Sequence, residues 1–99
     1  MFAISQDEDG TVRLSGRFDA AQVQAAQEVL SKLKTSCVVD FKNLDYISSA
    51  GLGILFATQK RLRETNQRLI LKNLNSHIRD IFRIARFDLI FDLADSEKG

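Results

Sequence analysis

The sequence predicts an α/β domain in which three helices pack on a mostly parallel sheet. Two apolar runs, residues 37–41 and 69–71, are too short for helices, which is typical of buried strands. Other apolar residues recur at helical spacing between and after these runs. Strands that alternate with helices indicate parallel strands joined by right-handed crossovers. We therefore expect the order β-β-α-β-α-β-α-β, with a mixed sheet of four to five strands in a single domain, residues 1–99.

The first residues predict a hairpin. Apolar and polar residues alternate at 2–4, as in a half-buried strand. The stretch Asp-Glu-Asp-Gly at 7–10 predicts the turn, because Gly10 is free to adopt a positive φ. The alternation resumes at 12–14, and we expect this second strand to stop near Gly16.

The first helix is predicted to begin at Asp19, whose carboxylate can cap free amides. Gln22 lies three residues further on, as in a capping box. An apolar stripe then follows at helical spacing: Val23, Ala26, Leu30 and Leu33. We expect this helix to fade at residues 34–36.

Residues 37–41 predict the central strand, and 42–47 predict a connection to the second helix. That helix is expected from Ser49 to about residue 65. Asn66 is expected to end it, because asparagine tolerates the left-handed conformation that often follows a helix. The apolar face of the helix would comprise Leu52, Leu55, Phe56 and Leu62.

The last third predicts a strand at 69–71, a third helix and a final short strand at 89–93. Asn75 or Ser76 would cap the third helix. Its apolar face would comprise Ile78, Ile81, Phe82 and Ala85.

Composition argues against several functions. Fourteen Lys and Arg residues face thirteen Asp and Glu, so the net charge of +1 lacks the basic excess typical of nucleic-acid binders. The single cysteine, Cys37, cannot form an internal disulfide or a thiolate metal site, which fits a reducing cytoplasm. No leader and no apolar run of about 20 residues stands out, so we expect a cytoplasmic protein that does not insert into membranes.

Small residues and two hydroxyls gather where the second helix begins. Ser48 and Ser49 stand within the segment Tyr-Ile-Ser-Ser-Ala-Gly-Leu-Gly, residues 46–53. They would lie near unpaired amides at the positive end of the helix dipole. A serine there can cap the helix, and the same place tolerates an anion, including a phosphate on serine. The residues alone leave both interpretations open, with the cap the simpler one.

The same segment resembles the signature of the STAS domain family, in its branch of bacterial anti-sigma-factor antagonists. Those proteins carry Asp-Ser-Ser-Gly-Leu-Gly or Asp-Ser-Ala-Gly-Leu at this point, and the serine after the acidic position is phosphorylated. Residues 48–53, Ser-Ser-Ala-Gly-Leu-Gly, match this pattern with Ser48 in the acidic position, so the resemblance places the phosphoacceptor at Ser49. The likeness extends over nearly the whole chain: Gly16-Arg17-Phe18-Asp19, the strand at 38–41, and the residues 78–82 and 87–91.

The resemblance implies a regulatory function without catalysis. The dephosphorylated domain would bind an anti-sigma factor that is itself a serine kinase with a histidine-kinase-like ATPase fold, and the sigma factor would be released. Phosphorylation of Ser49 would prevent binding, and a serine phosphatase would reset the switch. The partner-binding residues would be Asp19, Ser48, Ser49, Ala50, Gly51 and Leu52.

Two other functions fit the same resemblance. The chain could be a STAS scaffold or subunit, as in lipid-transport ATPase complexes or stress-signalling assemblies, where Ser49 would only contact the partner. It could also be a sensor that binds an anion or nucleotide at the helix N-terminus. The sequence has no phosphate-binding glycine loop of the P-loop or dinucleotide type, and it gives no support for a cofactor or an enzyme.

Two aspartates also need an interpretation. Asp19 most simply caps its helix, but its turn should lie at the same sheet edge as Ser49, where it could contact a partner. Asp40 stands in an apolar strand, so its carboxylate needs partners. Nearby loop amides are the simpler partners, and an orienting contact to the turn at Ser48 and Ser49 is the more specific one.

The remaining candidates have simple structural interpretations. Arg79, Arg83 and Arg86 form a basic stripe that is expected to be solvated. His77 is the only histidine, and the sequence places no acid and serine with it as a catalytic triad would. Packing explains Cys37 in a buried strand.

Overall fold

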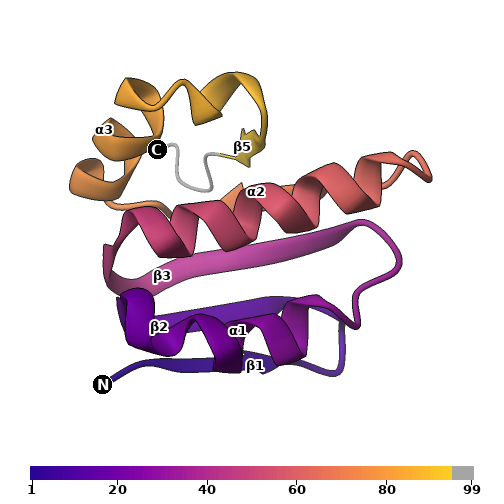
Figure 1. Cartoon of the computed structure of the whole chain (residues 1–99), viewed down its shortest axis with the longest axis horizontal. Helices are drawn as coiled ribbons and strands as arrows, with labels where there is room; N and C mark the ends of the chain where they lie inside the picture. Colours follow the sequence, from indigo (N-terminus) through magenta and orange to yellow (C-terminus); the bar gives the residue numbers. More distant parts are fainter. Residues whose placement is uncertain (95–99) are drawn as a thin grey trace.

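A computed structural model describes residues 1–94 and contains the predicted α/β fold (Figure 1). Five strands form one sheet in the order β1-β2-β3-β4-β5, and β1 and β2 are antiparallel while the other neighbours are parallel. The strands are β1 (Ala3–Gln6), β2 (Val12–Phe18), β3 (Cys37–Ile47), β4 (Leu69–Lys72) and β5 (Asp92–Ala94). The helices are α1 (Val23–Leu30), α2 (Ser49–Arg63) and α3 (Ser76–Ile84), with short 3₁₀ helices η1 (Ala20–Gln22) and η2 (Phe87–Leu89). The predicted class, the order of strands and helices along the chain, and the number of helices are therefore confirmed.

The sheet progresses in one direction through three crossovers, which explains why its helices gather on one face. Figure 1 shows α1 and α2 side by side in front of the sheet. Side chains of β3 alternate accordingly: Val39 and Phe41 are fully buried, whereas Val38 and Lys42 are not. Phe41 meets Phe82 of α3 edge to face at 6.0 Å, so α3 packs on this face as well.

Polar side chains of α2 tie its neighbours together. The Arg61 guanidinium donates to the carbonyls of Leu30 and Leu33, both at 2.9 Å, and so caps the C-terminal end of α1. Buried Gln59 accepts from the Leu69 amide and donates to the Ile90 carbonyl, both at 2.8 Å. These bonds join α2 to α1, to β4 and to the segment before β5.

Two strands are longer than predicted. The expected connection at 42–47 is wrong, because β3 continues to Ile47 beside β2, with buried Leu44 and Ile47 among exposed polar residues. The second strand also passes Gly16 and ends at Phe18. Gly16 has φ of 84°, and a Cβ there would lie 1.6 Å from the Met1 carbonyl oxygen, so this irregular point in the strand requires glycine.

Three helix boundaries differ from the predictions. Asp19 caps the 3₁₀ helix η1, and α1 begins only at Val23 and ends at Leu30. The second helix ends at Arg63, followed by Asn66 in the expected left-handed conformation with φ of 64°. Asn75 caps α3 by accepting from the Ile78 amide at 2.8 Å.

The final strand begins later in the sequence than the predicted range of 89–93. Residues 87–89 form η2 after the chain turns at Arg86, which has φ of 65°, and the strand covers Asp92–Ala94 instead. Two residues assigned to apolar faces are exposed, Phe56 on α2 and Ala85 after α3. Thr58 and Gln59 are buried on α2 beside Leu55 and Leu62.

Candidate functional site

The turns that contain Asp19 and Ser48 meet at the carboxyl ends of β2 and β3. Phe18 and Ile47 are register partners at these ends, and the Ser48 amide donates to the Phe18 carbonyl at 2.9 Å. Gly51 in the first turn of α2 lies against the same residues. A Cβ on Gly51 would lie 2.9 Å from Cγ1 of Ile47 and 3.1 Å from the Phe18 oxygen. The structure thus brings the two predicted turns together, and the small residue allows the close approach.

The two neighbouring serines have different structural roles. Ser48 is the N-cap of α2, and its half-buried hydroxyl accepts from the Gly51 amide at 3.2 Å. Ser49 is the first residue of the helix and is exposed, and its hydroxyl makes no hydrogen bond with any residue from 1 to 94. The capping role considered for a serine at this helix start therefore belongs to Ser48, and the Ser49 hydroxyl faces solvent.

The first turn of α2 has positive electrostatic character. Its amides at Ser49 and Ala50 have no acceptor among residues 1–94, and its first turn holds no acidic side chain. Lys60, Arg61 and Arg63 lie in the last turn, where cations complement the opposite end of the helix dipole. The start of α2 can consequently accommodate negative charge.

The remaining predicted site residues differ in exposure. Ala50 is half-buried, and Gly51 and Leu52 are buried beneath the turn, so they support it more than they display it. Asp19 is half-buried and accepts from the Ala21 amide at 3.2 Å and from Nε2 of Gln22 at 3.4 Å. Asp19 therefore caps the helix. The reciprocal bond of a capping box, in which the Asp19 amide donates to the side-chain oxygen of Gln22, is not among the bonds of the described chain.

Among residues 1–94, the partners of the Asp40 carboxylate do not include Ser48 or Ser49. It is 4% exposed and accepts from the Lys42 amide and from Nδ2 of Asn73, both at 2.9 Å, and it forms an ion pair with Arg13. None of its hydrogen bonds in the described chain reaches Ser48 or Ser49, so the orienting role is wrong. Burial alone raises the pKa of Asp40, but the bonds from Asn73 and Lys42 and the charges of Arg13 and Lys72 lower it overall.

One feature near the site was not predicted. The Arg17 guanidinium lies 4.2 Å from the centre of the Tyr46 ring, and the two residues are register partners at the ends of β2 and β3. This contact stands two residues before Asp19 and two before Ser48. The only sequence signal for this contact is that Arg17 belongs to the motif at residues 16–19. Its pairing with Tyr46 could not be predicted, because it depends on the register of β2 and β3 after Gly16.

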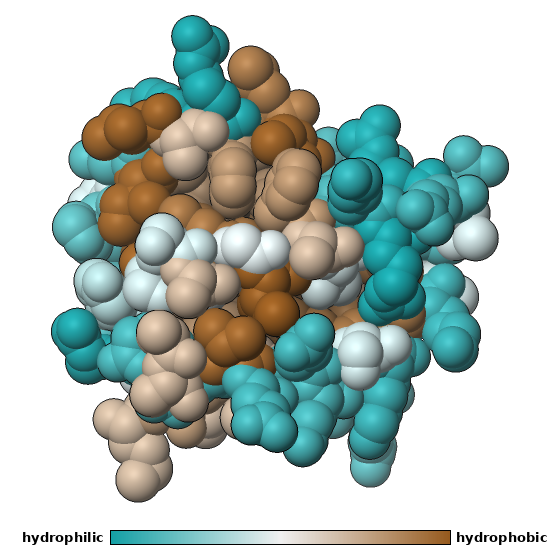
Figure 2. All heavy atoms as spheres, in the orientation of Figure 1, coloured by the Kyte–Doolittle hydropathy of each residue, from teal (hydrophilic) through white to brown (hydrophobic). Residues whose placement is uncertain are grey.

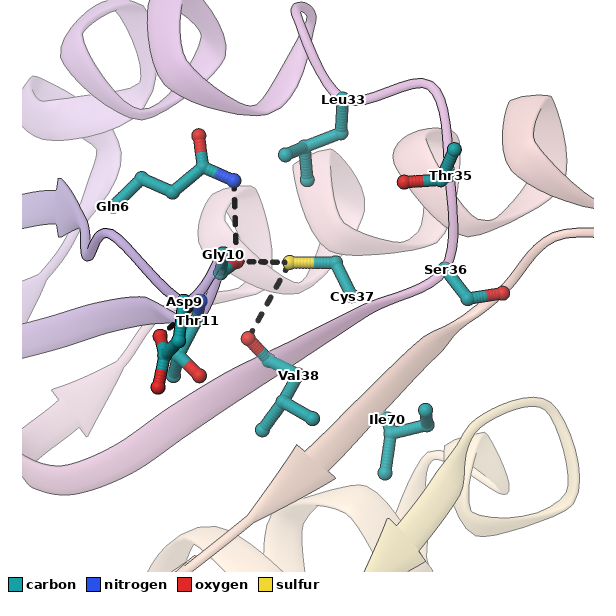
Figure 3. A pocket seen from close by; sticks show the side chains of 10 residues that line it. All are labelled: Gln6, Asp9, Gly10, Thr11, Leu33, Thr35, Ser36, Cys37, Val38 and Ile70. Carbon is teal, nitrogen blue, oxygen red and sulfur yellow. Dashed lines mark hydrogen bonds between the residues drawn. The ribbon is translucent and has the colours of Figure 1, made fainter.

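A hollow of about 280 Å³ lies at the other end of the β2–β3 pair (Figure 3). The Cys37 thiol is buried there and donates to the Gly10 carbonyl at 3.1 Å and the Val38 carbonyl at 3.4 Å. Burial raises the pKa of Cys37, so the thiol is protonated at neutral pH. This agrees with a packing role for Cys37.

The third helix carries the expected basic residues, but they do not form one free stripe. Arg83 pairs with Asp80 at 3.2 Å, and Arg86 lies beyond the helix in the turn that follows it. Within residues 1–94, no three His, Cys, Asp or Glu side chains gather closely enough to hold a metal ion. Over the same range, none of the helices is long and apolar enough to cross a membrane.

The fold and the turn at Ser48 and Ser49 together are those of a STAS domain. The family described as "Mlab, STAS domain" matches residues 2–93, and the chain belongs to this family. The chain is similar to the "Putative anti-sigma factor antagonist BtrV" of Bordetella bronchiseptica, with 36% identity over 85 residues that cover 86% of this chain and 72% of the relative. It is also similar to the "Anti-sigma-B factor antagonist" of Staphylococcus aureus, with 27% identity over 81% of this chain and 78% of that protein.

The fold matches that of solved STAS structures. The unphosphorylated form of the anti-sigma factor antagonist SpoIIAA superposes with a TM-score of 0.72 over 98% of this chain and 90% of that chain, at 20% identity. The phosphorylated form of Bacillus SpoIIAA gives the same TM-score over 99% of this chain and 93% of that chain, also at 20% identity. These matches establish the fold.

Proposed function

We propose that this STAS domain is an anti-sigma-factor antagonist that is switched by phosphorylation of Ser49. The observation that carries the proposal is the division of roles between the two serines: Ser48 caps α2, and Ser49 exposes its hydroxyl. The names of relatives that align over most of the chain support the same function. The domain would act in the cytoplasm by binding protein partners, without a catalytic activity of its own.

In the proposed mechanism, the unphosphorylated surface around Ser49 binds an anti-sigma-factor serine kinase, and the sigma factor is released. The kinase transfers phosphate to the Ser49 hydroxyl, which adds about −1.5 to −2 charges at pH 7. The amides of Ser49 and Ala50 and the helix dipole stabilise this charge, so the domain stays folded.

The added charge acts on the partner interface. A protein interface that must bury an unpaired charge loses several kcal/mol, which corresponds to orders of magnitude in affinity. Phosphorylation would therefore release the kinase, and a serine phosphatase would restore binding. Asp19, Ser48 and Ala50 would contribute to the contact surface, while buried Gly51 and Leu52 would hold its shape.

The test is phosphorylation of the purified domain by the serine kinase encoded nearest to its gene, with Mg-ATP and site mapping by mass spectrometry. We expect one phosphate, on Ser49. Ser49→Ala should abolish labelling and retain kinase binding, and Ser49→Asp should weaken binding. Ser48→Ala is the matched control, since it removes the neighbouring hydroxyl and should still be labelled.

Other results would contradict the proposal in distinct ways. Phosphate on Ser48 alone would overturn the site assignment. Copurification with an ATPase subunit without labelling would favour the scaffold function, and thermal stabilisation by a nucleotide in the absence of a protein partner would favour the sensor.

A further inference from the structure

Large apolar side chains are exposed where α2, α3 and η2 meet. Phe56, Ile84 and Leu89 are 39%, 82% and 74% exposed. Phe87 stacks on Phe56 with ring centres 5.8 Å apart, which links the helix to the segment after α3. Figure 2 shows apolar side chains gathered around α3 and the following segment, on the side that borders α2. Soluble monomers rarely expose such a cluster without a binding function. We call Phe56, Ile84, Phe87 and Leu89 the corner patch.

Arg86 adds a charge to the corner patch at a conformational cost. Three residues other than glycine have positive φ in the described chain, and two of them, Asn66 and Asn73, are of the type that tolerates it. The third is Arg86, with φ of 65°, where glycine or asparagine would be less strained. Arg86 forms no ion pair with any residue from 1 to 94, whereas Arg83 pairs with Asp80. Arg86 is thus a strained cation without an ion-pair partner in residues 1–94, and it stands beside exposed Ile84 and Leu89. This points to a carboxylate supplied by a partner.

The corner patch is continuous with the start of α2. Ser49, Gly53 and Phe56 follow one another at spacings of four and three residues, so they share one side of the helix, and all three are exposed. Apart from its chain neighbours and the backbone of the helix itself, no heavy atom of the described chain lies within 4 Å of a Cβ built on Gly53. This side of the helix is therefore open between Ser49 and Phe56. Ser49 and Phe56 are seven positions apart, which corresponds to about 10 Å along the helix axis. One protein partner can therefore contact both ends.

We propose that Ser49 and the corner patch are two ends of a single docking surface occupied by the anti-sigma-factor kinase. The kinase would place apolar side chains against Phe56, Ile84 and Leu89 and a carboxylate against Arg86. Ser49 would carry the switch, and the corner patch would supply affinity that phosphorylation does not directly remove. This inference rests on the proposed function and adds to it the second half of the partner's footprint.

The test is the Kd of the kinase for patch variants, measured by calorimetry. Ile84→Ser and Leu89→Ser should each weaken binding by about tenfold or more, as expected for buried apolar contacts. Ala3→Ser introduces the same residue at an exposed apolar position on β1, at the opposite edge of the sheet, and should leave Kd within about twofold. Circular dichroism should show all three folded, because the substituted side chains are exposed.

Arg86→Gly gives a second test, because it should raise the stability of the domain and lower its affinity for the kinase. Relief of the left-handed strain should raise the melting temperature by about 2–5 °C, while loss of the guanidinium should weaken kinase binding by about fivefold. A variant that is more stable and binds less well cannot owe its weaker binding to unfolding. If Arg86→Gly bound the kinase with unchanged affinity, the proposed contact between Arg86 and a carboxylate of the kinase would be wrong.

The outcomes separate this inference from the proposed function. If Ser49→Asp abolishes binding while both patch variants bind like the wild type, the corner patch is not part of the footprint and only this inference fails. If the wild-type domain does not bind the kinase, both fail. If the patch variants change a dimer into a monomer in light scattering without affecting kinase affinity, the occupant is a second copy and the inference is overturned.

Discussion

The two ends of the β2–β3 pair contain side chains of opposite character. At the carboxyl end, Ser49 is exposed and has no hydrogen bond within residues 1–94. At the amino end, Cys37 is 8% exposed, and its thiol is bonded to the Gly10 carbonyl. The difference shows how a hydroxyl is left exposed at a helix start: Ser48 accepts from the Gly51 amide, so the cap does not need the adjacent Ser49. At the amino end, no neighbouring side chain of the described residues replaces the Cys37 thiol in its hydrogen bond to the Gly10 carbonyl. The thiol therefore stays bonded and buried.

The largest expected effect concerns Asp40, which lies between these two ends and joins β2, β3 and the residue that follows β4. Asp40→Asn should lower the free energy of unfolding at pH 7 by about 1–3 kcal/mol, because the buried bonds from Asn73 and Lys42 and the pair with Arg13 lose their charge. The measurement is urea unfolding followed by circular dichroism.

The effect of Asp40→Asn should also depend on pH. The folded-state pKa of Asp40 is below its ordinary value of 3.8. The charge therefore stabilises the fold above pH 4, and this contribution is lost as pH falls through the folded-state pKa. The difference between wild type and variant should shrink below pH 4. A difference that stays constant down to pH 2.5 would contradict the role assigned to the charge.

Two glycines of α2 provide the next comparison. Gly51→Ala introduces a Cβ at 2.9 Å from Ile47 and 3.1 Å from the Phe18 oxygen, whereas Gly53→Ala meets nothing within 4 Å. Gly53→Ala should raise stability by about 0.5–1 kcal/mol through helix propensity. Gly51→Ala should be about 1–3 kcal/mol less stable than Gly53→Ala because of overpacking. Equal melting temperatures would mean that the close approach of the two turns does not constrain position 51.

The paired serines should differ in stability by a smaller amount. Ser48→Ala should cost about 1 kcal/mol because it removes the N-cap, and Ser49→Ala should stay within about 0.5 kcal/mol of the wild type. Thermal unfolding of the two variants measures this directly. If Ser49→Ala lost more stability than Ser48→Ala, Ser49 would be the capping residue, and the assignment of the cap to Ser48 would be wrong.

The smallest effect is expected at Cys37, on the rate of labelling by a thiol reagent. Burial raises the pKa of the thiol and restricts access, so labelling of the native protein at pH 7.5 should be far slower than labelling in denaturant. Rapid native labelling would mean that the amino end is open, and the contrast with Ser49 would disappear.

Much of the fold was predictable because local patterns and topology agree. Apolar runs and helical stripes were sufficient to predict the succession of strands and the three helices along the chain. The predictions failed where tertiary contacts outweigh local pattern. The polar residues at 42–47 continue a strand because β2 lies beside them, and Phe56 stacks on Phe87 instead of entering the core.

The candidate site was predictable in position but not in detail. A pair of serines before a small-residue helix start indicates a cap, but sequence alone cannot decide which serine caps. That choice depends on where the helix begins, and here Ser48 has extended backbone while Ser49 is helical. The bonds of Asp40 to Asn73 and Arg13 involve residues 33 and 27 positions away, which no local pattern encodes.

The most direct test of the account is the affinity of the kinase for the domain before and after stoichiometric phosphorylation of Ser49, with circular dichroism and melting temperature recorded on the same samples. We predict that the Kd rises by at least about 100-fold, as expected for an unpaired charge at an interface, while the spectrum and melting temperature remain close to those of the unphosphorylated protein. Equal affinity in both states would contradict the switch. Loss of binding together with unfolding would contradict the claim that the start of α2 accommodates the phosphate.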